Sequence, residues 1–483
     1  MISTSSRALR GGLLSAAALC VAAAAEPALA VKFDFHGDLN NRFQLYNNQR
    51  DFFNGFGSGG RGVIRDEDNA EDENFGEIKY RLWTEAATDN DEVKGVFAFE
   101  IGGIRFGENL GNTRGGDGAF SGDGVNAETL WAYVDFGIPT LQDQRVVAGL
   151  QPHTVNKHLW SETATGITIK GPINNMADYS FAWMRGNEAG NSLSVAQDDD
   201  GFSGADNFSL NLNASPIPGL KGGVFVLYQH NDQTSGGTGV IDATRYEIKS
   251  ISEGSQYDLW SFGTDGSYSM PVPVGSAFLN WSVIYQTGEI ENMAFQPFAG
   301  ARTPVQDFDV SAFFGRTDLG LVMGPTTVTY TFWYSSGDDD AGDNDFDAFI
   351  ATDVDMFDSM IFFENYTDDN FFAETPYLLD KGFILNKLQV DHKLTPKVTV
   401  SGLASYHALA EDVALADGSS DDSLGVELGG RLSYKPYPSL EIGTEVAYLI
   451  GDDALDAFEE PGIQDGDSDE NLLHWAMRFR YKF

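Results

Sequence analysis

The chain has 483 residues, of which 42% are hydrophobic and 13% aromatic, and this composition excludes general disorder. Lys and Arg number 30 against 72 Asp and Glu, so the formal net charge is −42. Nucleic acid is therefore excluded as a partner, because neutralising its phosphates requires a basic surface. The single Cys excludes a disulfide framework and a cysteine-ligated metal site. Beyond the first thirty residues there is no run of about 18 apolar residues, so a bundle of transmembrane helices is excluded as well.

The first 30 residues have the pattern of a secretory signal peptide. Two arginines precede an apolar run that contains Cys20, and Ala28-Leu29-Ala30 places small residues where signal peptidase cuts. The alternative is an amphipathic first helix. We expect residues 1–30 to be cleaved, which leaves an exported mature domain of residues 31–483 without a cysteine.

Apolar and polar residues then alternate along most of the chain. Val31-Lys32-Phe33-Asp34-Phe35-His36 is the first example, and segments 208–214, 277–285, 328–334 and 398–406 repeat the pattern. Period-two alternation predicts strands with one apolar and one polar face. Such strands fit either a soluble sandwich with an apolar core or a transmembrane barrel with an apolar face in lipid.

The lengths of the connections favour the barrel. Short turns alternate with long Gly- and Asp-rich loops, as in outer-membrane barrels, where short periplasmic turns alternate with long outer loops. The predicted turns are Thr88–Glu92, Ile138–Gln142, Ser215–Gly219, Pro271–Gly275, Leu394–Pro396 and Lys435–Ser439. The predicted long loops are Asn48–Asn74, Gly107–Ala127, Asn187–Ala205, Asn231–Gln256, Gly337–Asp380 and Gly451–Glu470.

The last eleven residues give a second argument for the barrel. Leu473–Phe483 alternates strictly and ends in Phe, so it resembles the terminal strand of bacterial outer-membrane proteins. On a closed barrel this strand pairs with the first strand, which begins at Val31. The expected fold is an all-β, transmembrane antiparallel β-barrel of 16 or 18 strands, with 18 preferred. Aromatic residues are expected on its lipid face, namely Phe35, Tyr80, Phe97, Phe99, Phe136, Tyr285 and Tyr448.

A block in the first third of the chain resembles a known family. It contains Val96–Gly102, Gly115–Ala119, Trp131–Phe136 and Val147–Gln151, and it is similar to the homotrimeric outer-membrane porins of sulfate-reducing bacteria, which are Gram-negative porin-like barrels. The resemblance covers about residues 75–170. It implies a homotrimer of diffusion pores in the bacterial outer membrane, in contact with lipid and lipopolysaccharide. It does not indicate a substrate, and the loop Gly337–Asp380 has no counterpart in the family pattern.

In porin-like barrels the loop after the fifth strand folds inward and narrows the pore. In this sequence that loop is predicted at residues 153–162. Its candidate constriction residues are Lys157, His158, Trp160 and Glu162. The alternative is an exposed loop like the others.

Basic residues are expected to form one wall of the lumen. Arg478 and Arg480 in the last strand, Arg42 in the first, and Lys79 and Arg81 in the second share the polar register. These strands become neighbours when the barrel closes. Opposite carboxylates such as Glu162, a basic wall would produce a transverse field that orients passing solutes. Lys32 and Lys482 are expected at the periplasmic rim instead.

Most of the acidic residues lie in the predicted loops. Asp465, Asp467 and Asp469 partly match a calcium-binding loop, but Glu470 and Ala476 stand where that motif needs Gly and Glu. They are weak calcium candidates, and no other metal or cofactor is expected. An acidic mouth attracts cations within roughly 10 Å, which predicts a weak cation preference, partly opposed by the basic wall.

Three functional hypotheses follow. The first is an outer-membrane porin for passive diffusion of small hydrophilic solutes and ions. The second is a substrate-selective channel for carboxylates, sugar acids or an exported polysaccharide. The third is a secreted β protein or a barrel that sheathes a partner. We expect no enzyme activity, because His158, Ser161 and Glu162 lie on one loop and seldom reach triad geometry from there.

Overall fold

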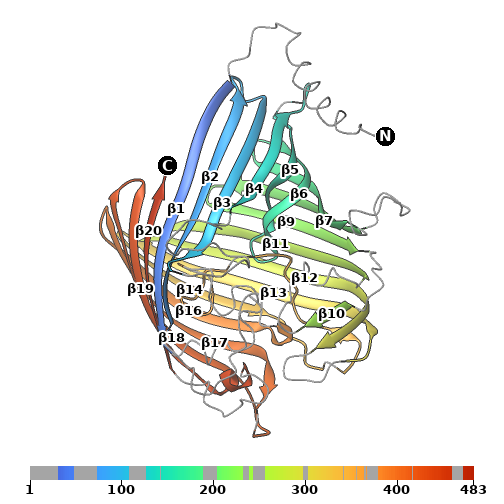
Figure 1. Cartoon of the computed structure of the whole chain (residues 1–483), viewed down its shortest axis with the longest axis vertical. Helices are drawn as coiled ribbons and strands as arrows, with labels where there is room; N and C mark the ends of the chain where they lie inside the picture. Colours follow the sequence, from blue (N-terminus) through green and yellow to red (C-terminus); the bar gives the residue numbers. More distant parts are fainter. Residues whose placement is uncertain are drawn as a thin grey trace, which may run out of the picture.

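The computed structural model describes residues 31–47, 73–107, 127–141, 143–188, 204–231, 239–242, 256–296, 303–340, 342–354, 356–363, 366, 379–415, 417–458 and 471–483. Within these ranges 20 strands belong to one sheet. Two of them, β10 (Gly239–Asp242) and β15 (Asp345–Phe346), are short and pair in parallel with their neighbours. The other 18 are antiparallel and form the wall of a closed barrel (Figure 1). The predicted fold is confirmed, with 18 strands rather than 16.

The strands of the wall follow one another in chain order. Their bounds are β1 Val31–Asn47, β2 Glu73–Thr88, β3 Val93–Arg105, β4 Ala127–Gly137, β5 Arg145–Asn156, β6 Trp160–Asn174, β7 Ala177–Glu188, β8 Gly204–Ile217, β9 Leu220–Asn231, β11 Gln256–Val272, β12 Gly275–Gln296, β13 Gln306–Met323, β14 Thr326–Ser335, β16 Phe383–Thr395, β17 Val398–Ala414, β18 Ser420–Tyr437, β19 Leu440–Ile450 and β20 Leu472–Lys482. Two 3₁₀ turns, η3 (Leu379–Lys381) and η4 (Asp453–Phe458), lie in connections. No helix in the described part of the chain is long and apolar enough to cross a membrane.

The barrel closes between its first and last strands. The pairing of β1 with β20 runs from Asp38 opposite Lys482 to Asn47 opposite Leu473, and the two strands lie side by side in Figure 1. The first and last strands therefore leave no free edge at the two ends of the sheet, and the prediction that the last strand pairs with the first is confirmed. The soluble sandwich is excluded, because the strands form one ring rather than two stacked sheets.

The outer face of the barrel is apolar, as period-two alternation predicts. Rows of outward side chains follow the register from strand to strand, and one row joins Phe181, Leu210, Val226, Phe262, Tyr285 and Phe313 across β7–β13. Most members of this row are exposed. An exposed apolar and aromatic belt around a closed barrel is the surface that membrane-spanning barrels present to lipid.

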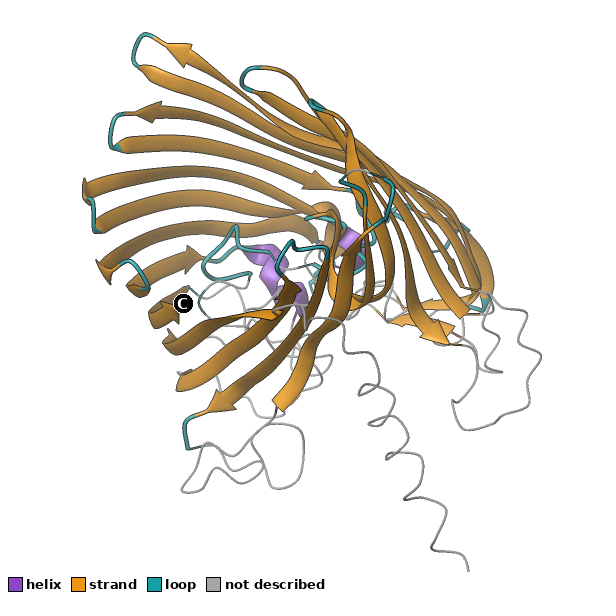
Figure 2. Cartoon of the chain, turned by 90° about the horizontal axis from the view of Figure 1, so that it is seen from above, coloured by secondary structure: helices purple, strands orange, loops and turns teal. Residues whose placement is uncertain are grey.

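The main apolar core lies inside the barrel. It contains inward side chains of the wall together with residues from the long connection between β14 and β16. Figure 2 shows described loop segments enclosed by the ring of strands. Barrels of this size ordinarily keep a water-filled lumen. The extent of this apolar core therefore determines how much of the lumen remains open to water.

Candidate functional site

One connection fills much of the lumen. We call residues 337–340, 342–354 and 356–363, between β14 and β16, the lumen segment. Its aromatic side chains pack against the inner face of the wall: the Phe363 ring stacks on Trp333 at 5.5 Å between centroids, and Phe349 lies 5.3 Å from Phe314. All four side chains are completely buried. The predicted outer loop Gly337–Asp380 is therefore, in its described part, a folded insert rather than a solvent-exposed loop.

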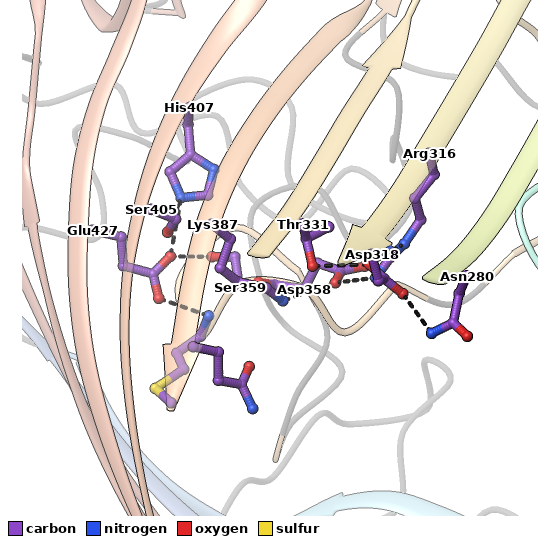
Figure 3. A network of polar contacts seen from close by, with 12 residues as sticks. Asn280, Arg316, Asp318, Thr331, Asp358, Ser359, Lys387, Ser405, His407 and Glu427 are labelled. Carbon is purple, nitrogen blue, oxygen red and sulfur yellow. Dashed lines mark hydrogen bonds and ion pairs between the residues drawn. The ribbon is translucent and has the colours of Figure 1, made fainter. Parts of the chain in front are cut away.

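Asp358 anchors the lumen segment to two strands. Arg316 of β13 donates to the Asp358 carboxylate from both terminal nitrogens, one at 2.9 Å, and Lys387 of β16 donates to it at 2.8 Å (Figure 3). Burial alone would raise the pKa of Asp358, but Lys387 and Arg316 outweigh it and hold the pKa well below its usual value. The carboxylate is therefore charged at neutral pH, and the anchor is an ion triplet.

A second anchor lies on the next strands of the wall. Ser359 donates its hydroxyl hydrogen to Glu427 of β18 at 2.5 Å, and the Met360 amide donates to the other oxygen of the same carboxylate at 2.9 Å. Glu427 also lies 3.3 Å from His407 of β17, which hydrogen-bonds Ser405 at 2.8 Å (Figure 3). Three consecutive residues of the segment, Asp358, Ser359 and Met360, are thus fixed to β13, β16 and β18.

The predicted constriction loop has different bounds in the structure. β5 extends to Asn156 and β6 starts at Trp160, so residues 153–162 are the end of a β-hairpin rather than a loop. The alternation of residues 145–155 continues through His153, and the prediction of a loop there was wrong for this reason. We call residues 150–165 the inner hairpin.

The end of the inner hairpin lies inside the barrel, against the opposite wall. Asn156 donates to Asp265 of β11 at 3.0 Å and to Ser282 of β12 at 3.1 Å. The ring of His158 lies 4.8 Å from Phe314 of β13. Burial lowers the pKa of His158 well below 6.5, with Arg316 adding to the effect, so its imidazole is neutral.

The inner hairpin and the lumen segment join in one layer. The Ser161 amide donates to the Asp353 carbonyl at 2.9 Å, and the Thr352 amide donates to the Leu159 carbonyl at 2.7 Å. Trp160, which bridges in parallel to Asp353, is buried in this layer. The layer lies against β8–β13, with hydrogen bonds from Asn211 to the Val155 carbonyl and from Thr352 to Gln229 among its contacts.

A cavity of about 440 Å³ remains on the other side of that layer. The five basic residues predicted for the pore wall, Arg42, Lys79, Arg81, Arg478 and Arg480, all lie around it. The rest of its lining is Asp38, Asn40, Glu100, Glu128, Thr129, Leu130, Leu150, Glu162, Thr163 and Phe357. Of the four predicted constriction residues, Glu162 lines this cavity, Lys157 is exposed at the hairpin turn, and His158 and Trp160 are buried.

The basic side chains around this cavity include two arginines that are more exposed than the carboxylates with which they pair. Arg81 lies 2.5 Å from Glu100, yet 44% of its side chain is exposed against 10% for Glu100. Arg480 forms an equivalent pair with Asp38 at 2.5 Å, with 31% and 14% exposed. The carboxylates behind orient the guanidinium groups, whose outer donors face the lumen.

Arg478 and Arg42 are held more tightly. Arg478 donates to Glu441 at 2.8 Å and lies over the Tyr366 ring, with its guanidinium carbon 4.1 Å from the ring centroid. Arg42 is almost completely buried and pairs with Glu77 at 2.8 Å. These two arginines form the rigid part of the basic wall, whereas Arg81 and Arg480 are its accessible part.

Sequence reasoning missed the lumen segment as part of the site. Phe357 is exposed by 60% and lines the cavity, although its neighbours in the chain are buried. The available signal was the density of aromatic residues between Phe346 and Tyr366, which is unusual for a solvated acidic loop. Neither period-two nor helical spacing accompanies it, so no element was predicted there.

The remaining candidates are placed as follows. Asp465, Asp467 and Asp469 lie outside the described residues, and no group of three His, Cys, Asp or Glu side chains within the described ranges could hold a metal ion. His158 packs among aromatic rings, whereas the Ser161 hydroxyl lies 3.1 Å from that of Thr154 and Glu162 lines the cavity. The three residues considered for catalysis thus have different surroundings.

No protein-family model matches the sequence, and no curated protein is significantly similar to it. Solved structures are similar over almost the whole chain. They include OccAB1 of Acinetobacter baumannii, with a TM-score of 0.54 and 12% identity over 93% of this chain and 96% of that chain. OccK9 (OpdG) of Pseudomonas aeruginosa has a TM-score of 0.53 and 12% identity over 94% and 98%, and OccK8 (OprE) of the same organism has 0.52 and 9% over 94% and 98%.

This chain shares the fold of the Occ outer-membrane porins. At such low identities the likeness concerns the fold alone. The lumen of this chain is described by its own residues, which are the basic wall, the inner hairpin and the lumen segment. The narrower resemblance to porins of sulfate-reducing bacteria stays a prediction.

Proposed function

We propose that this protein is a substrate-selective outer-membrane channel for small carboxylate solutes, sugar acids among them. The observation that carries the proposal is the cavity of about 440 Å³ that remains beside the lumen segment, with five basic side chains around it. A general porin needs a wide water-filled lumen, whereas the lumen of this barrel contains a packed core of aromatic residues from the lumen segment and the wall.

The wall supplies the chemistry that a carboxylate requires. Guanidinium groups present planar pairs of N–H donors that match the two oxygens of a carboxylate. Arg81 and Arg480 keep outer donors toward the cavity while Glu100 and Asp38 orient them from behind. Glu100 and Asp38 already neutralise part of the charge of the two arginines. A bound carboxylate is therefore held weakly enough to leave again, as conduction requires.

Glu128 and Glu162 line the same cavity as the basic wall. They belong to β4 and β6, whereas the basic residues belong to β1, β2 and β20. Charges of opposite sign on different walls of one lumen orient a dipolar solute across its path. This arrangement supports selection by orientation as well as by charge.

Current recordings in planar bilayers test the proposal. In potassium chloride, added gluconate is expected to interrupt the single-channel current with an occupancy that saturates, and glucose is not. Equal effects of the two solutes would reject carboxylate selectivity. The weak cation preference predicted from the acidic composition is a separate question, which the reversal potential across a potassium chloride gradient answers.

Three further parts of the proposal rest on the sequence. We infer that the protein reaches the outer membrane through a cleaved signal peptide of residues 1–30 and that it assembles as a homotrimer in contact with lipopolysaccharide, as the family resemblance implies. N-terminal sequencing of the membrane form, with Val31 as the expected first residue, tests the cleavage. The native mass in detergent tests the trimer.

A further inference from the structure

The inner hairpin leaves the barrel wall on both of its sides. The pairing of β4 with β5 ends at Ala132 opposite Leu150, and the pairing of β6 with β7 ends at Thr165 opposite Arg185. Beyond these pairs, residues 127–131 of β4 are paired within the described strands with β3 alone. Among the described strands, the wall therefore has a break between β4 and β7, where the hairpin turns into the lumen.

The register shows which face of the hairpin bounds the cavity. Phe97, Ala132 and Leu150 form one cross-strand row, and Phe97 is exposed on the outer face of the barrel. Thr163 pairs with Pro152, two residues beyond Leu150, so it belongs to the same face of the hairpin.

The same argument holds for β4. A bulge at Leu130 shifts the register of β4, so that Thr129 is opposite Phe99, another exposed residue of the outer face, although Trp131 is opposite the buried Ala98. Yet Thr129, Leu150 and Thr163 all line the cavity that the basic wall lines from the inside. Residues in register with the lipid-facing surface and residues of the lumen thus bound one space.

The lining of the cavity is polarised between these two sides. Arg81, Arg478 and Arg480 lie on β2 and β20, whereas β4, β5 and the lumen segment contribute the apolar side chains Leu130, Leu150 and the exposed ring of Phe357, beside the carboxylates Glu128 and Glu162 of β4 and β6. A solute that satisfies both sides has a carboxylate at one end and an apolar chain at the other. A sugar acid can contact the basic side with its carboxylate and Glu128 and Glu162 with its hydroxyls, but it has no apolar part to contact Leu130, Leu150 and Phe357.

We propose that the break between β4 and the inner hairpin is a lateral portal through which amphipathic carboxylates pass between the cavity and the outer leaflet. This inference rests on the proposed function, since the basic wall holds the carboxylate while the apolar chain leaves sideways. Unpaired backbone is tolerated at membrane depth only where it lines a water-filled cavity or is covered by protein. Residues 128–130 of β4 meet that condition, because they line the cavity.

Fluorescence quenching tests whether the portal is open to lipid. A bimane label is placed on Thr163→Cys in the mature chain of residues 31–483, which has no other cysteine, and the protein is reconstituted in liposomes. The expected result is quenching both by brominated phospholipid and by aqueous iodide. Two matched controls give the limiting results. A label on Phe97→Cys, on the outer face, is quenched by the brominated lipid, and a label on Asn40→Cys, in the cavity lining, is quenched by iodide alone. A Thr163→Cys label that resembles the Asn40→Cys control, because another loop or a second subunit covers the break, would overturn the proposal.

Transport gives a second, independent test. Pro152→Trp places a bulky side chain on the outward face of the hairpin, just beyond the last pair with β4, outside the cavity lining. Transfer of decanoate into the liposome membrane is expected to fall by about tenfold, a size typical of steric discrimination, while gluconate flux stays within a factor of about two. An equal fall for both solutes would overturn the lateral route. Absence of gluconate flux in the unmodified protein would reject the proposed function itself, whatever the quenching shows.

Discussion

Gly37 and Phe483 are in contact where the first and last strands pair, and the Phe483 ring occupies the space that a side chain at position 37 would need. Their backbones exchange two hydrogen bonds of 3.0 and 3.1 Å, and a Cβ on residue 37 would lie 2.4 Å from the Cε1 atom of the Phe483 ring. The terminal ring thus lies where any other residue at position 37 would have its side chain. The first and last strands are matched at this point in shape as well as in register.

Gly37→Val is therefore expected to weaken closure. The added side chain must displace the Phe483 ring, and such overpacking costs about 1–3 kcal/mol. The temperature at which the barrel loses its heat-modifiable mobility in gel electrophoresis should fall. Gly95→Val is the matched control, because nothing lies within 4 Å of a Cβ at that position. Equal effects of the two substitutions would show that the Phe483 contact is unimportant.

Asp358→Asn should loosen the lumen segment. The substitution leaves the buried cations Arg316 and Lys387 facing a neutral amide, and breaking a buried ion pair from one side costs about 3–5 kcal/mol. We expect larger and noisier single-channel currents and a lower melting temperature. Asp345→Asn, at an exposed position of β15, is the control. Unchanged currents in Asp358→Asn would mean that the second anchor, at Glu427, suffices.

Asp338 gives the lumen segment a pH dependence. Burial, reinforced by the nearby Asp380 carboxylate, raises the pKa of Asp338 from 3.8 to about 7. An acid whose pKa is raised in the folded state favours folding when protonated, and this contribution is lost as the pH rises from about 4 to about 7. The wild type should therefore lose stability over this range, and Asp338→Asn should lose less. A parallel pH profile of melting temperature in the two proteins would contradict the assignment.

Arg81→Gln should weaken the interaction with carboxylates. Arg81 is the most exposed of the wall arginines, and the loss of one charged, bidentate partner is expected to raise the gluconate concentration for half-maximal block by about tenfold. Lys32→Gln is the matched control, since Lys32 is 66% exposed and pairs with Asp34 outside the cavity. A similar change in both variants would indicate a general charge effect instead of a site.

The fold and the basic wall could be predicted because both follow from local alternation. Arg42, Arg81 and Arg478 occupy the polar positions of the alternation in their strands, so their side chains face the lumen. The pairing of the first strand with the second and with the last makes these three strands neighbours. Short turns occur at the six predicted places, although β8, β11, β16 and β18 extend into four of them and residue 142 lies outside the described ranges. The structure adds turns between β6 and β7 and between β13 and β14.

The lumen segment could not be predicted in the same way. Its position depends on partners far away in the sequence, such as Arg316 for Asp358 and Glu427 for Ser359. Nothing in the local sequence distinguishes these carboxylates and hydroxyls from those of a solvated loop. The inner hairpin was misjudged for the opposite reason, because its strand pattern continues smoothly past the point where it leaves the wall.

The concentration dependence of gluconate flux into proteoliposomes tests the central claim most directly. If a basic-walled cavity beside a packed lumen segment selects carboxylates, the flux saturates, and a second carboxylate competes with it whereas glucose does not. A flux that rises linearly with concentration, is indifferent to competitors and is matched by glucose would contradict the account and indicate an open, unselective pore.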